Sequence, residues 1–190
     1  FLSGGIDSST IVAVMNHLRS SHDNKTFTIG FNEKSFSEIP QARFVADYLG
    51  VSHHDKIVTG DIIESLAEMV YHADEPFADT SFIPMYYLAQ FSRQHVTVCL
   101  SGDGGDELFC GYETYLADWL CWKTRWIPRR LTKLASNITK AILPTRFNKI
   151  SFDYKLKQFL EGHSSNVQYA HYYWRNIFSD KEKALLIRPE

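Results

Sequence analysis

The chain opens with Phe1-Leu2-Ser3-Gly4-Gly5-Ile6-Asp7-Ser8-Ser9, and an apolar run at helical spacing follows from Ile11. This order predicts the end of a strand, a glycine loop and the start of a helix. Two adjacent glycines allow a tight turn and a close approach to a ligand. We expect the N–H groups of Ser8, Ser9 and Thr10 to be unpaired donors at the positive end of the helix dipole, where phosphate binds well.

Asp7 would repel a phosphate, so its expected task is to hold a magnesium ion that phosphate oxygens also bind. A glycine pair alone is compatible with any tight turn, but the full S-G-G-x-D-S pattern is more specific. It lacks the lysine of the G-x-x-x-x-G-K-[ST] phosphate loop. It resembles instead the pyrophosphate loop of the ATP pyrophosphatases, enzymes that cleave ATP between its α and β phosphates.

The composition is that of a globular protein, with 190 residues, 44% hydrophobic and 22% charged. The sequence contains no run of eighteen apolar residues, so we expect no transmembrane helix. The three cysteines form no C-x-x-C pair, which favours reduced thiols and a cytoplasmic location. Because the chain starts inside its first strand and without methionine, we expect it to be part of a longer protein.

Charge divides the chain near residue 121. Residues 1–120 carry 6 Lys or Arg and 17 Asp or Glu, whereas residues 121–190 carry 14 and 5. We therefore predict a nucleotide-binding core over residues 1–121 and a helical extension over 122–190. A basic half can bind nucleic acid. Here the basic residues alternate with apolar ones at helical spacing, so solvated helix faces are the favoured interpretation and nucleic acid is not expected as a partner.

The next elements predict a parallel sheet. Residues 25–31 have the composition of a strand, residues 37–49 that of a helix with Ser37 as N-cap, and residues 51–58 that of a second strand. Gly50 is expected to end the helix. Strands that alternate with helices imply parallel pairing with right-handed crossovers, and ligands lie at the carboxyl ends of such strands.

Three further segments have simpler interpretations. Residues 53–55, His-His-Asp, are not expected to bind one metal ion, because adjacent side chains on a strand point to opposite faces. A helix from Asp61 to about residue 71 is predicted, with its buried stripe at Ile62, Leu66, Met69 and Val70. The acidic residues Asp74, Glu75 and Asp79 either line the site or lie in a solvated loop.

A buried strand is predicted over residues 96–100, and it leads into Ser101-Gly102-Asp103-Gly104-Gly105-Asp106-Glu107. The spacing of this acidic loop is not that of a calcium-binding EF-hand. At the end of a central strand the loop would face the first loop across one cleft. Asp7 and Asp106 could then bracket magnesium, and Asp103 could interact with the reacting group or a substrate amine.

Beyond residue 121 the sequence becomes aromatic and basic. A helix over residues 166–178 is predicted, with an apolar stripe at Val167, Ala170, Trp174, Ile177 and Phe178. Residues 143–165 give no clear signal.

Together these motifs resemble the synthetase domain of glutamine-hydrolysing asparagine synthetases. The resemblance rests on residues 3–9, 28–31, 53–54, 74–76 and 101–112, in that order along the chain. It implies an α/β fold with a three-layer parallel sheet of the ATP pyrophosphatase type, which is similar to the adenine nucleotide α hydrolases, and a mostly helical C-terminal part.

The resemblance also implies a reaction. Mg²⁺-ATP binds, the side-chain carboxylate of aspartate attacks the α-phosphorus, and β-aspartyl-AMP and pyrophosphate form. Ammonia from an N-terminal glutaminase domain, which this sequence lacks, then gives asparagine. A homodimer is compatible with the resemblance, a membrane partner is not expected, and the chain alone is expected to be inactive.

By position, the resemblance assigns four residues to the adenosine and seven to the pyrophosphate. The adenosine would contact Leu2, Ile29, Ser101 and Gly102, and the pyrophosphate would lie against Ser3, Gly4, Gly5, Ile6, Asp7, Ser8 and Ser9. Asp7 and Asp106 would hold Mg²⁺. Asp103 stands where the family more often has glutamate, so its reach to substrate differs, and Cys110 replaces a usual glycine, which we interpret as a change in packing.

Three functions remain open at this point. The first is the ATP-dependent amide synthesis described above, on aspartate or on another carboxylate. The second is modification of tRNA by an enzyme with the same loop, for which salt-sensitive RNA binding would be evidence. The third is a non-catalytic module that binds ATP.

Overall fold

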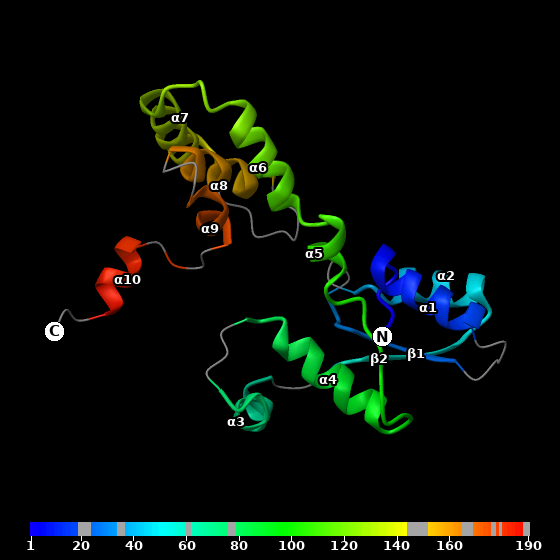
Figure 1. The fold of residues 1–190 in the computed structure, drawn as a ribbon. Helices are drawn as coiled ribbons and strands as arrows, with labels where there is room; N and C mark the ends of the chain where they lie inside the picture. Colours follow the sequence, from blue (N-terminus) through cyan, green and yellow to red (C-terminus); the bar gives the residue numbers. More distant parts are fainter. Residues whose placement is uncertain are drawn as a thin grey trace. The chain divides into compact units, whose positions relative to one another are not determined.

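A computed structural model describes residues 1–18, 24–33, 37–59, 62–75, 79–143, 152–164, 169–175, 178 and 180–187. The chain forms two compact units, residues 1–106 and 107–190. The functional division into residues 1–121 and 122–190 stays a prediction. Figure 1 shows the parallel sheet and the helices of the first unit, and the helices of the second.

The first unit contains a two-stranded parallel sheet, as predicted. Strand β1 (Lys25–Gly30) pairs with β2 (Ser52–Ile57) in a register that sets Lys25 opposite Ser52 and Gly30 opposite Ile57. The connection between them contains α2 (Ile39–Leu49). The helix ends at Gly50, whose φ of 65° lies in the left-handed region that glycine adopts without strain.

The predicted N-cap of α2 is wrong by one residue. Glu38 occupies the N-cap position, and no side chain caps the helix there. Pro40 lies in the first turn, where its fixed φ favours the start of a helix and its missing N–H costs nothing. Ser37 instead places its hydroxyl against Gly30, where an added Cβ would lie 2.6 Å from Ser37 Oγ.

Helices cover both faces of this sheet. Arg43 of α2 donates two hydrogen bonds to Asp55 of β2, at 2.8 and 2.9 Å. Phe27 of β1 lies opposite His54, the residue before Asp55. It packs against Phe91 of α4 (Phe82–Arg93), with ring centroids 5.9 Å apart. Successive side chains of a strand point to opposite faces, so α2 and α4 lie on opposite sides.

The core of the first unit lies between α1 (Ile6–Leu18), α2 and the sheet. It contains Leu2, Val12, Ala42 and Ala46, all at most 4% exposed. Two alanines on α2 allow that helix to approach closely. This core fixes the start of α1, and therefore the first loop, against the sheet.

The predicted buried strand over residues 96–100 is wrong. These residues have no strand assignment, and the side chains of Val98 and Leu100 are 79% and 53% exposed. Only the last residue resembles a sheet partner, because the amine nitrogen of Phe1 donates to the carbonyl oxygen of Leu100 at 2.6 Å, while Leu2 N donates to Phe27 O. Apolar residues with high β propensity need a paired neighbour to become a strand.

Helix α3 (Ile62–Ala73) forms where predicted, but most of its predicted stripe is exposed. Met69 is 1% exposed, whereas Leu66 and Val70 are 49% and 59% exposed. The reason is that α3 packs mainly on one helix, α4, where Tyr87 donates to the hydroxyl of Ser65 at 3.0 Å. The predicted cap, Asp61, and the side chain of Ile62 lie outside the described residues.

The second unit is helical. It contains α6 (Glu113–Lys123), α7 (Arg129–Ile142), α8 (Phe152–Ser164), α9 (Ala170–Arg175) and α10 (Asp180–Leu186); α5 (Gly105–Phe109) begins in the first unit. Ala170 and Trp174 are buried with Cys121, as their predicted stripe requires. Phe178 is 50% exposed, which contradicts the prediction because α9 ends three residues earlier. Val167 and Ile177 lie outside the described residues.

Candidate functional site

The first loop is held by its own serines. Gly4 turns the chain with a φ of 83°. Ser8 Oγ donates to the carbonyl oxygen of Gly5 at 3.2 Å and accepts from Ser3 N at 3.2 Å and from the Ser3 hydroxyl at 2.9 Å. Ser3 Oγ in turn accepts from Gly5 N at 3.2 Å. The hydroxyls of Ser3 and Ser8 therefore shape the loop.

The helix after the loop begins earlier than predicted. Helix α1 starts at Ile6, and Ser9 N already donates to Gly5 O at 3.0 Å. The N–H groups of Ser9 and Thr10 are thus inside the helix and not free donors, contrary to the prediction. The first-turn N–H groups without a carbonyl four residues earlier in the helix belong to Ile6, Asp7 and Ser8.

Ser9 still differs from the other loop serines. Its hydroxyl oxygen is buried and has no hydrogen-bond partner, whereas those of Ser3 and Ser8 each make at least two hydrogen bonds. A buried hydroxyl without a partner costs stability in the protein alone. Ser9 is therefore the loop serine with hydrogen-bonding capacity to spare.

The second loop has a comparable internal bond. Ser101 Oγ donates to Asp103 Oδ2 at 2.8 Å, and Gly105 N donates to Gly102 O at 3.1 Å. Gly104 has a φ of 87°, which reverses the chain before α5. Asp103 is exposed and Asp106 is half-buried. The serine thus fixes one oxygen of the Asp103 carboxylate.

The structure brings the two loops into direct contact. A Cβ added to Gly102 would lie 2.7 Å from Ser8 N, and a Cβ added to Gly105 would lie 2.4 Å from Asp7 Cγ. Each glycine therefore lies so close to the first loop that no side chain fits. The sequence predicted that the loops face each other, but not that Gly105 contacts Asp7. The paired glycines at 104 and 105 were the available signal.

These residues fit a Mg²⁺-nucleotide. Asp7 lies against Gly105, the residue that precedes Asp106 in the chain; that Asp106 also faces this junction stays a prediction. In the described part of the chain, no three His, Cys, Asp or Glu residues gather as a metal site. Magnesium needs only one or two carboxylates when phosphate oxygens supply other ligands.

The residues assigned to adenosine differ in how much of their side chains is exposed. The side chain of Leu2 is 2% exposed and belongs to the core. Ile29 is half-buried near the carboxyl end of β1. Sequence reasoning missed Gln41, on which the first loop rests: a Cβ on Gly4 would lie 2.6 Å from Gln41 Cβ. Nothing local in the sequence links these two positions.

The backbone at Cys110 explains why the resemblance implies glycine at this position. Its φ is 57°, in the left-handed region, and its side chain is exposed. The interpretation of this change as one of packing is therefore wrong. Glycine adopts this conformation without the steric cost that any Cβ brings.

The His-His-Asp segment has structural contacts. Thr26 Oγ1 donates to Ser52 O, so it accepts from His53 Nδ1 at 2.8 Å. His54 lies on the other face of the sheet from His53 and stacks on Phe27, with ring centroids 5.4 Å apart. Burial lowers the pKa of His53, and the hydrogen bond from Arg43 lowers the pKa of Asp55. Both histidines are thus used in packing, and their side chains have different partners.

The acidic segment after α3 is only partly described. Asp74 has a φ of 59°, and Asp79 Oδ1 accepts from Ser81 N at 2.9 Å near the start of α4. Residues 76–78 between them lie outside the described residues. Whether these acids line the site stays a prediction.

Among the described residues, none of the helices has the length and apolar character of a membrane span.

Comparisons with known proteins agree with these motifs. The sequence matches the family model described as asparagine synthase over residues 1–181. It is 40% identical to glutamine-hydrolyzing asparagine synthetase 1 of Bacillus subtilis, in a match that covers 76% of this chain and 22% of that protein.

Other organisms have similar proteins. A putative glutamine-hydrolyzing asparagine synthetase of Methanocaldococcus jannaschii is 38% identical, over 100% of this chain and 35% of that protein. Asparagine synthetase 3 of Arabidopsis thaliana is 35% identical, over 58% of this chain and 21% of that protein. The chain therefore spans only a fifth to about a third of the length of these relatives. The family match and these identities show that the chain belongs to the asparagine synthase family.

Proposed function

We propose that the protein containing this chain makes asparagine from aspartate and ammonia at the expense of ATP, which is cleaved to AMP and pyrophosphate. One observation carries the proposal: the Ser-Gly-Gly loop and the acidic glycine loop lie in contact through Gly102 and Gly105. We also propose that the sheet is part of a three-layer ATP pyrophosphatase fold, which suits its two helix-covered faces.

In this mechanism the first loop binds the departing pyrophosphate. The N–H groups of Ile6 and Asp7 belong to the first turn of α1, where the helix dipole favours negative charge, whereas Ser8 N lies against Gly102. The bonds of Ser3 and Ser8 hold these donors in place before the nucleotide arrives. Donors that are already oriented stabilise developing charge without reorganisation.

Attack by a carboxylate on the α-phosphate joins two anions, so their repulsion must be reduced. Asp7 and Asp106 would hold a Mg²⁺ ion, which neutralises phosphate charge and aligns the leaving group. Asp103, oriented by the hydroxyl of Ser101, would contact the reacting group or the amine of the acceptor amino acid. Acyl-adenylate formation and its capture by ammonia would follow at this junction.

The relatives' name, glutamine-hydrolyzing, motivates the rest of the proposal. Ammonia would come from a glutaminase domain elsewhere in the protein, and the chain alone would bind nucleotide without turnover. We further propose a cytoplasmic enzyme, compatible with a homodimer, whose nucleotide-binding core and helical extension divide at residue 121.

The test measures pyrophosphate and AMP release by the full-length protein with Mg²⁺-ATP and ammonia, with and without aspartate. We expect both products only with aspartate, and a loss of at least about 100-fold in Asp7→Asn and Asp106→Asn. Asp47→Asn, an exposed acid on α2, is the matched control and should retain activity. Release that ignores aspartate would point to another acceptor carboxylate, and formation of ADP would contradict the reaction class.

A further inference from the structure

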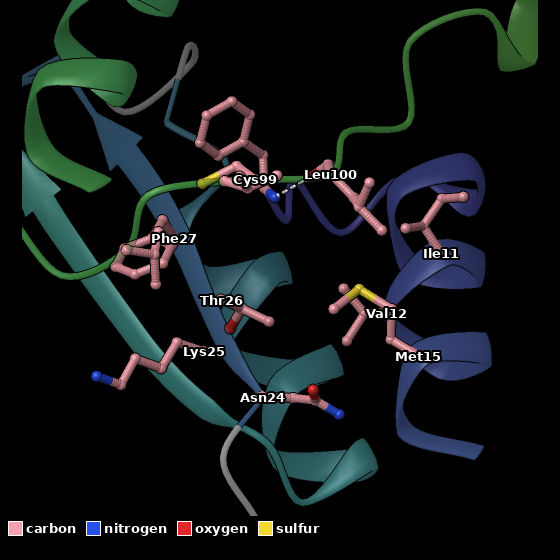
Figure 2. A pocket seen from close by; sticks show the side chains of 12 residues that line it. Ile11, Val12, Met15, Asn24, Lys25, Thr26, Phe27, Cys99 and Leu100 are labelled. Carbon is pink, nitrogen blue, oxygen red and sulfur yellow. Dashed lines mark hydrogen bonds between the residues drawn. The ribbon is translucent and has the colours of Figure 1, made fainter. Parts of the chain in front are cut away.

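A small cavity of about 50 Å³ lies behind the two loops, between α1, the start of β1 and residues 96–100. We call it the Asn24 cavity. Val12 and Met15 of α1 form one wall, and Phe27 and Leu100 contribute to others (Figure 2). Helix α1 begins at the first loop, and residues 96–100 lead directly into the second.

One polar group of this lining is unused. Asn24 is 6% exposed, and its Nδ2 is buried without any hydrogen-bond partner. Figure 2 shows its amide extending from the start of β1 toward α1, below Val12 and Met15. Thr26, by contrast, has a hydroxyl already bonded to Ser52 O and His53. Among the described lining residues, Asn24 is therefore the side chain with a free buried donor.

The walls restrict what can fill the space. A buried water needs two to four polar partners, and because most of the lining is apolar, the cavity offers few of them besides the Asn24 amide. An anion would lose far more hydration than one hydrogen bond restores. A neutral molecule with an apolar body and one acceptor oxygen matches both the lining and the amide. A volume well below the roughly 150 Å³ that holds benzene limits it to a few heavy atoms.

We propose that the Asn24 cavity is a binding site for a small neutral molecule, such as a short ketone or alcohol, whose oxygen accepts a hydrogen bond from Asn24 Nδ2. The site is separate from the proposed nucleotide site and does not depend on its chemistry. An occupant would contact the elements that lead to both loops.

Two probes of the same shape test the role of the amide. Acetone and isobutene each have four heavy atoms, but only acetone has an acceptor oxygen. Binding to the full-length protein is measured by saturation-transfer NMR. We expect the saturation-transfer signal of both probes to reach a plateau as the probe concentration rises. Asn24→Leu should weaken acetone binding about two- to tenfold, the usual range for one hydrogen bond, and change isobutene binding less than about twofold.

Two variants complete the design. Asn137→Leu, at an exposed position of α7, should change neither probe. Val12→Leu narrows the cavity without touching the amide and should weaken both probes, which tests the site even if Asn24→Leu fails to fold. The proposal is overturned if neither probe saturates, if Asn24→Leu weakens both equally, or if Val12→Leu leaves both unchanged.

Discussion

Substitution of Gly105 by alanine isolates the contact between the loops. No positive φ is needed at Gly105, and alanine is favoured over glycine in a helix by about 0.5–1 kcal/mol, so the backbone of α5 accepts the change. The new Cβ would lie 2.4 Å from Asp7 Cγ, whereas ordinary contacts begin at 3.4 Å. The Asp7 carboxyl group must therefore move by about 1 Å.

A misplacement of this size at a reacting centre costs about 100-fold in rate, or about 2.7 kcal/mol of barrier. We expect Gly105→Ala to lower aspartate-dependent pyrophosphate release by the full-length protein by this factor. The carboxyl group of Asp7 can rotate away, but its Cβ would lie 2.8 Å from the new Cβ and moves only with the backbone, so we also expect a lower melting temperature. The assay compares release at saturating Mg²⁺-ATP with the melting curve of the same preparation.

Gly50→Ala is the opposite control. Gly50 has a φ of 65° with nothing within 4 Å of the added Cβ, so alanine there strains the backbone by about 1 kcal/mol and touches no loop. It should lower the melting temperature and leave the rate unchanged. Our reasoning is refuted if folded Gly105→Ala keeps its activity within about threefold, or if Gly50→Ala loses activity to the same extent.

Three further predictions concern stability. Cys110→Gly should raise the free energy of unfolding by up to about 1 kcal/mol in urea titrations, because it removes the Cβ at a φ of 57°; a decrease would contradict the backbone argument. Gly162→Ala should destabilise the helical unit by about 1–3 kcal/mol, because the new Cβ would overlap the indole nitrogen of Trp174. Tryptophan fluorescence follows the unfolding transition, and an unchanged midpoint would show that the indole moves freely. Burial lowers the pKa of His53 below its ordinary 6.5, so the unfolded state binds the proton first as the pH falls. The free energy of unfolding should therefore be constant above about pH 7.5 and fall as the pH drops through 6.5. His53→Gln should flatten this slope.

Sequence motifs predicted correctly those parts of the fold that depend on neighbouring residues alone. Gly4 and Gly50 adopt the positive φ angles that only glycine takes without strain, and the two loops form where their motifs lie. Strands β1 and β2 pair in parallel, because the helix between them requires a crossover. The contact of Asp7 with Gly105 was outside the reach of sequence, because it depends on how residues about 100 positions apart pack.

Apolar pattern was less reliable where a segment has few neighbours. Residues 96–100 have strand composition but no ladder, and α3 exposes Leu66 and Val70. Helix α7 shows the same problem clearly: its buried residues are Thr132 and Ser136, whereas Leu131 and Ile138 are 56% and 50% exposed. Small polar residues allow close packing on α8, so the most apolar face of a helix is not always its contact face.

Helix α8 was missed although its sequence contains a signal. Phe152, Leu156, Phe159 and Leu160 stand at helical spacing, and Phe159 stacks on Trp174 of α9 with ring centroids 5.9 Å apart. Two exposed ion pairs also link the helix to its neighbours. Lys155 pairs with Glu113 of α6, and Glu161 pairs with Lys140 of α7 at 2.7 Å. Pairs of this kind between distant segments leave no periodic signal in the sequence.

The hydrogen bond between Phe1 and Leu100 has a consequence for the order of folding. It joins residues 99 positions apart, whereas α1, β1, α2 and β2 contact one another within the first 57 residues. Closing a long chain segment costs entropy that later contacts must repay, and non-local contacts slow folding. The βαβ part should therefore become protected from hydrogen exchange first. The acidic loop should join it last, so that the proposed catalytic junction is assembled in the final step of folding.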